Sequence, residues 1–342
     1  MVSSVKNLRQ TPVMRFLAKY IMLAVSGLKR LGQTPVMRFL AKNIMLVVLV
    51  LLCVILSILS PHFLTFRNLM NIVLQSAPLG IVAIGMTYVI ITGGIDLSVG
   101  SVLAFSSAVG ASLMSADFPI VPSILIMLCV STGFGFSQGL LISRLRLPAF
   151  IATLGGMSIG RGMTMVFMQG RTISGMPSEF RFIGNGHFFE VIPVAVVIMA
   201  VVFLIAFYIL KYTAYGRSVY ALGGNREATR LSGINTKNVE AVAYGISGLT
   251  AGLGAAVLLA RIGTALPTGG EGLELDVIGA VVIGGASLSG GRGTIFGTLI
   301  GVLVLGVLSN ALNLLNVDPF ASGIVRGAVI LIAVLIDTFK KS

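Results

Sequence analysis

Apolar runs long enough to cross a membrane recur along the whole chain of 342 residues. Two examples are IMLVVLVLLCVILSILS from Ile44 and VAVVIMAVVFLIAFYIL from Val194. A hydrocarbon core about 30 Å thick needs roughly 20 apolar residues in a helix. The runs lack the alternation of apolar and polar residues that is typical of membrane barrel strands, so they predict helices. Only 10% of the residues are charged, against about 25% in soluble domains. We therefore expect an all-α integral membrane protein.

Glycine, proline and charged residues divide this apolar sequence into about ten predicted transmembrane helices. Small residues one helical turn apart, such as Gly248 with Gly252 and Gly293 with Gly297 and Gly301, favour close helix packing in lipid. We therefore expect a single bundle with broken helices. The predicted spans cover residues 43–60, 68–92, 98–115, 119–142, 149–168, 191–211, 238–260, 275–290, 294–312 and 321–338.

The formal net charge is +13, and its distribution predicts orientation rather than nucleic-acid binding. Basic residues beside apolar runs act as topology signals, because they stay on the cytoplasmic side. This rule places both termini in the cytoplasm. It also places there Arg144, Arg146, the segment from Lys211 to Lys237, and Arg292.

The N-terminal part of the sequence contains a tandem duplication. QTPVMRFLAKYIML from Gln10 recurs as QTPVMRFLAKNIML from Gln33, a period of 23 residues. Each copy is short and basic, and neither is long enough to span a membrane. We interpret residues 1–42 as a basic cytoplasmic leader, with a membrane-surface helix as the alternative, and residues 43–342 as the transmembrane domain.

The sequence contains no recognisable catalytic or metal-binding constellation. His62 and His187 are isolated, and Cys53 and Cys129 fall inside apolar runs without metal or redox spacing. No glycine-rich loop carries a lysine in the order that a phosphate-binding loop requires. We therefore expect neither an enzyme nor a chain with its own cofactor.

The longest polar interruption among the later spans runs from Lys211 to Ala241. Within it, Asn225 can cap a short helix whose first turn contains Glu227, and Gly233 can end that helix in a left-handed conformation. One interpretation is a plain solvated loop. The other is a rigid cytoplasmic helix that a second protein can push.

Four collinear segments carry a resemblance to a known family. They are TGGIDLSVGS, FIATLGGMSIGRGMTMV from Phe150, YGRSVYALGGNREATRLSGI from Tyr215, and ELDVIGAVVIGGASLSGGRGT from Glu274. They resemble the permease subunits of ATP-binding-cassette (ABC) importers for monosaccharides, the ribose type most closely. The match runs from about Pro61 to Asp337 and leaves out the duplicated N-terminus. Gln138 departs from it, because many relatives are expected to have a smaller Asn there, and this leaves the exact sugar open.

The resemblance implies a prokaryotic cytoplasmic-membrane transporter for a ribose-like pentose or a related sugar. Two copies of the permease, a homodimer, would stand in membrane lipid. A tandem ATPase would bind ATP and Mg in the cytoplasm, and an extracytoplasmic sugar-binding protein would deliver the sugar.

The resemblance also assigns roles to two groups of residues. Residues 212–237 would form the coupling loop that contacts the ATPase, and the outer segments 169–190 and 262–275 would face the binding protein. The docking residues would be Arg171, Arg181, Glu271 and Glu274. The coupling residues would be Tyr215, Gly216, Arg217, Gly223, Gly224, Asn225, Glu227, Ala228, Arg230 and Gly233.

One acidic residue, Asp96, lies within an apolar neighbourhood in GGIDLSVG, which shares five of eight residues with GGASLSGG from Gly284. This shared pattern predicts two helix breaks. In each of them paired glycines end one helix and a polar residue starts the next. We expect Asp96 to be an N-cap that accepts from the N–H of Ser98 or Val99. The residues of the two breaks are Gly93, Gly94, Asp96, Ser98, Gly284, Gly285 and Ser287, in which Ser287 is the neutral counterpart of Asp96.

Two alternatives for Asp96 remain open at this stage. The carboxylate could line the sugar path or its gate. It could instead carry a proton or cation in an ion-coupled secondary sugar transporter, since ionisable groups at membrane depth are functional candidates. For the protein as a whole, a third possibility is a passive channel or a structural scaffold, which would need no coupling helix.

Overall fold

The computed structural model describes residues 44–339, so the predicted leader and all but the last three residues of its duplication lie outside the described residues. The chain divides into two units, Met1–Val50 and Leu51–Ser342. The boundary falls inside helix α4.

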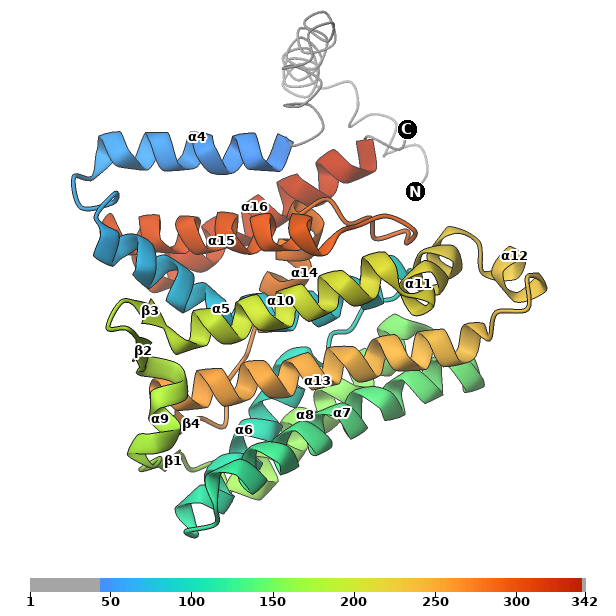
Figure 1. Ribbon diagram of the computed structural model, residues 1–342, viewed down its shortest axis with the longest axis horizontal. Coiled ribbons are helices and arrows are strands. Elements are labelled where there is room, and N and C mark those ends of the chain that lie inside the picture. Colours follow the sequence, from blue (N-terminus) through green and yellow to red (C-terminus); the bar gives the residue numbers. More distant parts are fainter. Residues whose placement is uncertain (1–43, 340–342) are drawn as a thin grey trace, which may run out of the picture. The chain divides into compact units, whose positions relative to one another are not determined.

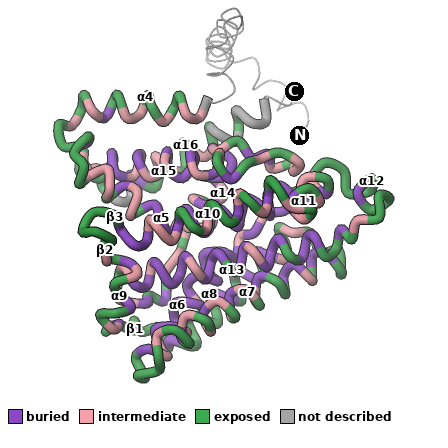
Figure 2. Tube along the Cα trace, in the orientation of Figure 1, coloured by how far each residue is buried: buried purple, intermediate pink, exposed green. Residues whose placement is uncertain are grey.

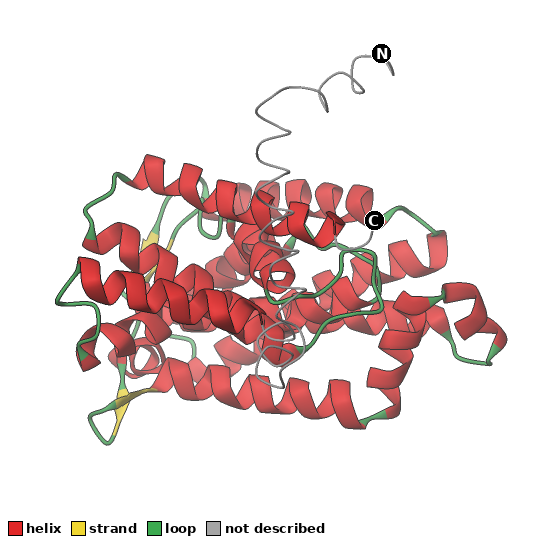
Figure 3. Ribbon diagram, turned by 90° about the horizontal axis from the view of Figure 1, so that it is seen from above, coloured by secondary structure: helices red, strands yellow, loops and turns green. Residues whose placement is uncertain are grey.

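The described residues form thirteen helices and four two-residue strands, so the chain is mostly helical as expected (Figures 1 and 3). The strands make two antiparallel pairs, β1 (Ile173–Ser174) with β4 (Thr264–Ala265) and β2 (His187–Phe188) with β3 (Ile192–Pro193). The helices are α4 (Ile44–Leu59), α5 (Phe66–Ile91), α6 (Val99–Ser115), α7 (Ile120–Leu145), α8 (Ala149–Met168), α9 (Ser178–Asn185), α10 (Val194–Tyr212), α11 (Ala214–Gly224), α12 (Arg226–Leu231), α13 (Thr236–Ile262), α14 (Leu273–Ile283), α15 (Ile295–Leu314) and α16 (Pro319–Phe339).

Six of the described helices are long and apolar enough to cross a membrane: α5, α7, α8, α10, α13 and α15. Helix α6, with 17 residues, is somewhat shorter. A count of about ten spans therefore stays a prediction. The predicted span over 275–290 is wrong in its extent, because α14 has 11 residues and ends at Ile283. At 1.5 Å per residue such a helix covers about 16 Å, roughly half of the hydrocarbon core.

Helices α5 and α13 lie at the centre of the bundle (Figure 2). In their most apolar windows 83% and 72% of the residues are buried, against 22% for α7 and for α8. Small residues let the helices of the bundle pack closely against one another. A Cβ added at Gly248 of α13 would lie 2.2 Å from the carbonyl oxygen of Ser131 in α7, and one at Gly301 of α15 would lie 1.9 Å from that of Ala280 in α14. The predicted close packing at these glycines is confirmed.

The two ends of the bundle carry different structures. Helices α11 and α12 lie at one end, and the four short strands lie at the other, beside α9 (Figure 1). Both predicted helix breaks lie near α11, because an added Cβ at Gly223 of α11 would meet Ile91 before the first break and Gly291 after the second. This arrangement brings the polar interruption from Lys211 to Ala241 to the same end of the bundle as the two breaks.

Candidate functional site

The first helix break lies where the glycine pair predicts it. Helix α5 ends at Ile91, Gly93 adopts a left-handed φ of 86°, and α6 begins at Val99. The amide of Gly93 donates to the carbonyl oxygen of Ile90 (2.9 Å) and that of Gly94 to Val89 (3.0 Å). These contacts satisfy carbonyls at the helix end, as in a typical glycine C-terminus.

Asp96 is 1% exposed and forms the centre of a polar network within the bundle. Its Oδ1 accepts from the amide (3.0 Å) and the hydroxyl (2.6 Å) of Ser98, and its Oδ2 accepts from the hydroxyl of Ser247 (2.7 Å). The expected contact with the Ser98 amide is present. However, Ser98 rather than Asp96 is the N-cap residue of α6, so Asp96 fixes the turn before the helix. No Lys or Arg of the described chain forms an ion pair with it.

The network ties the break to three other helices. Gln138 of α7, which is 3% exposed, donates through Nε2 to the Ser98 hydroxyl (2.6 Å). The carbonyl oxygen of Ile95 accepts from the hydroxyls of Thr153 in α8 (3.2 Å) and Tyr244 in α13 (3.4 Å). These partners were not predicted as members of the site. The sequence marks Gln138 only as a departure from relatives, and no residue near Tyr244 in the sequence predicts its contact with the break.

The second break repeats the first only in part. Helix α14 ends at Ile283, Gly285 adopts a φ of 92°, and the Ser287 hydroxyl accepts from the Ser289 amide at 3.3 Å. This is the same two-residue contact that Asp96 makes with Ser98. The prediction that a helix starts directly afterwards is wrong, because α15 begins only at Ile295. The reason is a run of left-handed glycines: Gly290, Gly291 and Gly293 have φ values of 82°, 71° and 152°.

The two breaks meet the end of α11 at a close backbone contact, here called the glycine junction: Gly93, Gly223, Gly290 and Gly291. The Gly291 amide donates to the Ile91 carbonyl oxygen (2.8 Å). A Cβ at Gly223 would lie 1.8 Å from that oxygen, and one at Gly290 would lie 3.0 Å from the Gly93 Cα. Three backbone segments therefore touch without intervening side chains.

The predicted short helix after Asn225 is confirmed as α12. The Asn225 side chain accepts from the Ala228 amide (2.9 Å), and Gly233 follows the helix with a φ of 82°. Glu227 and Arg230 form an exposed ion pair (2.6 Å). The hydrogen bond from Arg230 lowers the pKa of Glu227 below its ordinary value.

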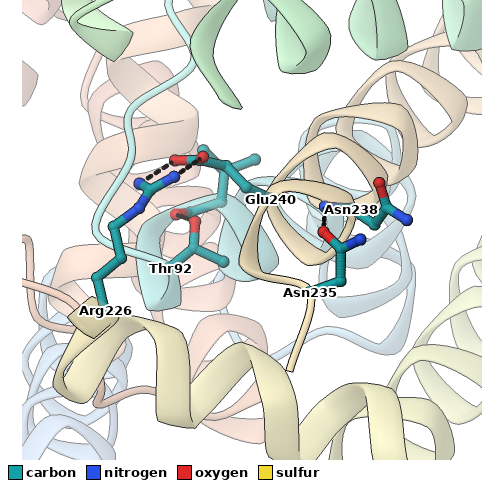
Figure 4. A network of polar contacts seen from close by, with 6 residues as sticks. Thr92, Arg226, Asn235, Asn238 and Glu240 are labelled. Carbon is teal, nitrogen blue, oxygen red and sulfur yellow. Dashed lines mark hydrogen bonds and ion pairs between the residues drawn. The ribbon is translucent and has the colours of Figure 1, made fainter. Parts of the chain in front are cut away.

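A second ion pair fastens the start of α12 to the bundle. The Arg226 guanidinium donates to both carboxylate oxygens of Glu240 in α13, with 2.9 Å between Nη1 and Oε1 (Figure 4). Glu240 is 5% exposed, and its hydrogen bond raises the pKa of Arg226. Figure 4 also shows Asn235, whose side chain accepts from the Asn238 amide (3.1 Å) at the start of α13.

The predicted coupling residues divide into an inner and an outer group. Gly216 is buried, and Tyr215 donates through its hydroxyl to the Val239 carbonyl oxygen (3.2 Å). Gly223 packs at the glycine junction. The outer group is exposed to solvent and comprises Arg217, Gly224, Asn225, Glu227, Ala228, Arg230 and Gly233.

Three of the four predicted docking residues, Arg171, Arg181 and Glu271, are exposed at the strand end of the bundle. Glu274 differs from them. It lies in the first turn of α14, and its Oε2 is fully buried. The reason is that the segment before α14 folds inward to Gly100 of α6. Glu274 is therefore only partly exposed, and its docking role stays a prediction.

The chain matches the model of a permease family over residues 68–334, described as the branched-chain amino acid transport system / permease component. It is similar to the ribose import permease protein RbsC of Escherichia coli K12, with 46% identity over 86% of this chain and 93% of the relative. The corresponding protein of Bacillus subtilis is 45% identical, over 86% and 92%. The L-arabinose ABC transporter permease protein AraH of Azospirillum brasilense is 36% identical, over 86% and 87%. No solved structure matches the chain.

Proposed function

The chain belongs to the family of branched-chain amino acid transport system permease components, and on that premise we propose how it moves its cargo. It is a membrane permease subunit of an ABC importer for sugars, since its close relatives are ribose and L-arabinose permeases. It is a transport subunit rather than an enzyme. Family membership does not support the ion-coupled secondary transporter that would use Asp96.

We propose a monosaccharide as the cargo, and a ribose-like pentose first, because the relatives with the highest identities reported above carry ribose in their names. An extracytoplasmic binding protein would deliver the sugar at the strand end of the bundle, where Arg171, Arg181 and Glu271 are exposed. A tandem ATPase in the cytoplasm would bind ATP and Mg.

The proposed assembly is a homodimer in the inner membrane, with about ten spans and both termini in the cytoplasm. The exposed face of α8 supports a second copy. Gly155 and Gly162 of this face have open space above them, and Ser158 is exposed. Small residues on an apolar helix allow close approach of another helix in lipid.

The observation that carries the proposed mechanism is the glycine junction. An ATPase that moves α11 and α12 would act directly on the end of α5 and on the second break, because Gly223 touches both Ile91 and Gly291. The Arg226–Glu240 pair would transmit the same movement to α13. Rigid-body rotation of packed helices about such contacts is a common way to alternate between two states.

Reconstitution tests this function. The chain would be placed in proteoliposomes with its ATPase and binding protein, and uptake of radiolabelled ribose or L-arabinose would be measured. We expect uptake only with ATP inside the compartment that contains the ATPase, and no effect of an uncoupler. Uptake that continues without ATP and stops when an uncoupler is added would refute the proposal.

A further inference from the structure

One face of α13 carries a stripe of three polar residues. Glu240, Tyr244 and Ser247 follow one another at spacings of four and three, so their side chains lie along the same face of the helix. All three are buried. The Glu240 carboxylate, near the start of the helix, binds the Arg226 guanidinium of α12 (Figure 4). The stripe therefore begins beside the short helix that a cytoplasmic ATPase would contact.

The other two members of the stripe bind the first helix break. The Tyr244 hydroxyl donates to the Ile95 carbonyl oxygen (3.4 Å), and the Ser247 hydroxyl donates to Asp96 Oδ2 (2.7 Å). The Tyr244 hydroxyl also lies directly against Gly94, where an added Cβ would clash with it. The same helix therefore contacts α12 near its start and, seven residues or about 10 Å further along, the break.

Helix α7 holds the same break and packs tightly on α13. Gln138 of α7 donates to the Ser98 hydroxyl (2.6 Å), and Ser98 in turn donates to Asp96. A Cβ added at Gly139 of α7 would lie 2.8 Å from the Cα of Ala241 in α13, so the two helix backbones touch. Close-packed interiors have low compressibility and transmit strain. Helices α7 and α13 therefore hold the break together as one body.

We propose that Tyr244 and Ser247 are positioning residues for transport, which make the first break follow α13 when the ATPase moves α12. Force enters at Arg226, passes along α13 from Glu240, and reaches Asp96 through Ser247. This is a second route to the break, beside the glycine junction, which acts through α11. The inference rests on the proposed ABC import mechanism.

The test uses the complete transporter in proteoliposomes, with its ATPase, its binding protein and saturating ribose. Ribose uptake and ATP hydrolysis are measured together, and the ratio of uptake to hydrolysis reports coupling. Ser247→Ala removes the donor to Asp96 and should lower this ratio about fivefold, within the range expected for substitutions that weaken coupling. Arg226→Met interrupts the other end of the route and should lower the ratio by a similar factor.

Combining the two changes separates a single route from two independent contacts. The contacts of Arg226 and Ser247 share no partner in the described chain and lie about 10 Å apart along α13, so independent effects would multiply to about 25-fold. If force passes along α13, the second change interrupts a route that is already cut. The double variant should then stay near the fivefold loss of each single variant.

Ser106→Ala is the matched control. Ser106 of α6 is fully buried and donates to the Met127 carbonyl oxygen of α7 (3.0 Å), so the change removes a buried serine hydrogen bond outside the stripe. Its ratio of uptake to hydrolysis should match that of the parent. If Ser247→Ala does not reach the membrane, Tyr244→Phe replaces it, because that change removes only the hydroxyl that binds Ile95. The same lack of multiplication with Arg226→Met is then expected.

A double variant that loses about 25-fold would overturn the inference, because two separate structural roles predict that product. An unchanged ratio in Ser247→Ala, or an equal loss in Ser106→Ala, would overturn it as well. Failure of the proposed function looks different, because the parent chain would then take up no sugar with ATP.

Discussion

Gly223→Ala at the glycine junction should uncouple the ATPase from transport and destabilise the protein. The new Cβ would lie 1.8 Å from the Ile91 carbonyl oxygen and 2.5 Å from the Gly291 amide nitrogen. Both are backbone atoms, so no side chain can rotate away. Overpacking of an interior typically costs about 1–3 kcal/mol, and losing the Gly291–Ile91 hydrogen bond costs about 1 kcal/mol more. We expect a loss of roughly 2–4 kcal/mol of stability.

Gly224→Ala is the matched control. It lies next in the same helix, has no atom within 4 Å of an added Cβ, and its φ is not left-handed. Replacing a helical glycine by alanine is favourable by about 0.5–1 kcal/mol where there is room, so this variant should be at least as stable as the parent.

Stability can be followed in detergent by heating and size-exclusion chromatography, since the chain has no tryptophan for intrinsic fluorescence. Ribose uptake and ATP hydrolysis are then measured in proteoliposomes. Gly223→Ala should lose most of its uptake per ATP hydrolysed, whereas Gly224→Ala tests whether an added methyl group beside the junction destabilises the fold by itself. Equal melting temperatures and equal uptake for the two variants would refute the reasoning.

Three further variants test the contacts around the junction. Asp96→Asn keeps an acceptor for Ser98 and should retain uptake within about twofold, whereas Asp96→Ala leaves buried donors unpaired and should cost about 1–3 kcal/mol in thermal stability; equal loss in both would show that the charge is needed. Arg226→Met leaves the buried Glu240 carboxylate unpaired and should lower stability by about 1–3 kcal/mol, which is less than for a fully buried pair because Arg226 is half exposed. A double variant that also changes Glu240 to Met should recover part of this loss in the same melting assay. Gly233→Pro cannot adopt the left-handed φ after α12 and should reduce uptake per ATP; unchanged coupling would place the ATPase contact elsewhere.

Local signals in the sequence predicted the local structures well. The all-α membrane class follows from the long apolar runs without strand-type alternation, because such a run must form a helix in lipid. Helix α12 follows from Asn225 and Gly233, whose cap and left-handed turn depend on neighbours within a few residues. The first break was placed correctly for the same reason, since Gly93 and Asp96 act on adjacent backbone.

Long-range contacts could not be predicted in this way. Ser247, which completes the Asp96 network, lies 151 residues further along the chain, and Gln138 lies 40 residues from its partner Ser98. The predicted span extended past the end of α14 because no charged residue follows Ile283 before Arg292, and the span count does not record left-handed glycines. The contact of one Glu274 carboxylate oxygen with Gly100, 174 residues earlier in the chain, has no local signal either.

The antiparallel pair of Ile173 with Ala265 and Ser174 with Thr264 has a mechanical consequence. The loop that leaves α8 and the loop that leaves α13 are hydrogen-bonded to each other, so neither can shift alone. The second of these loops continues directly into the segment that carries Gly269 and Glu274. A binding protein that presses on either loop would therefore move both loops together, and with them the segment that leads into α14.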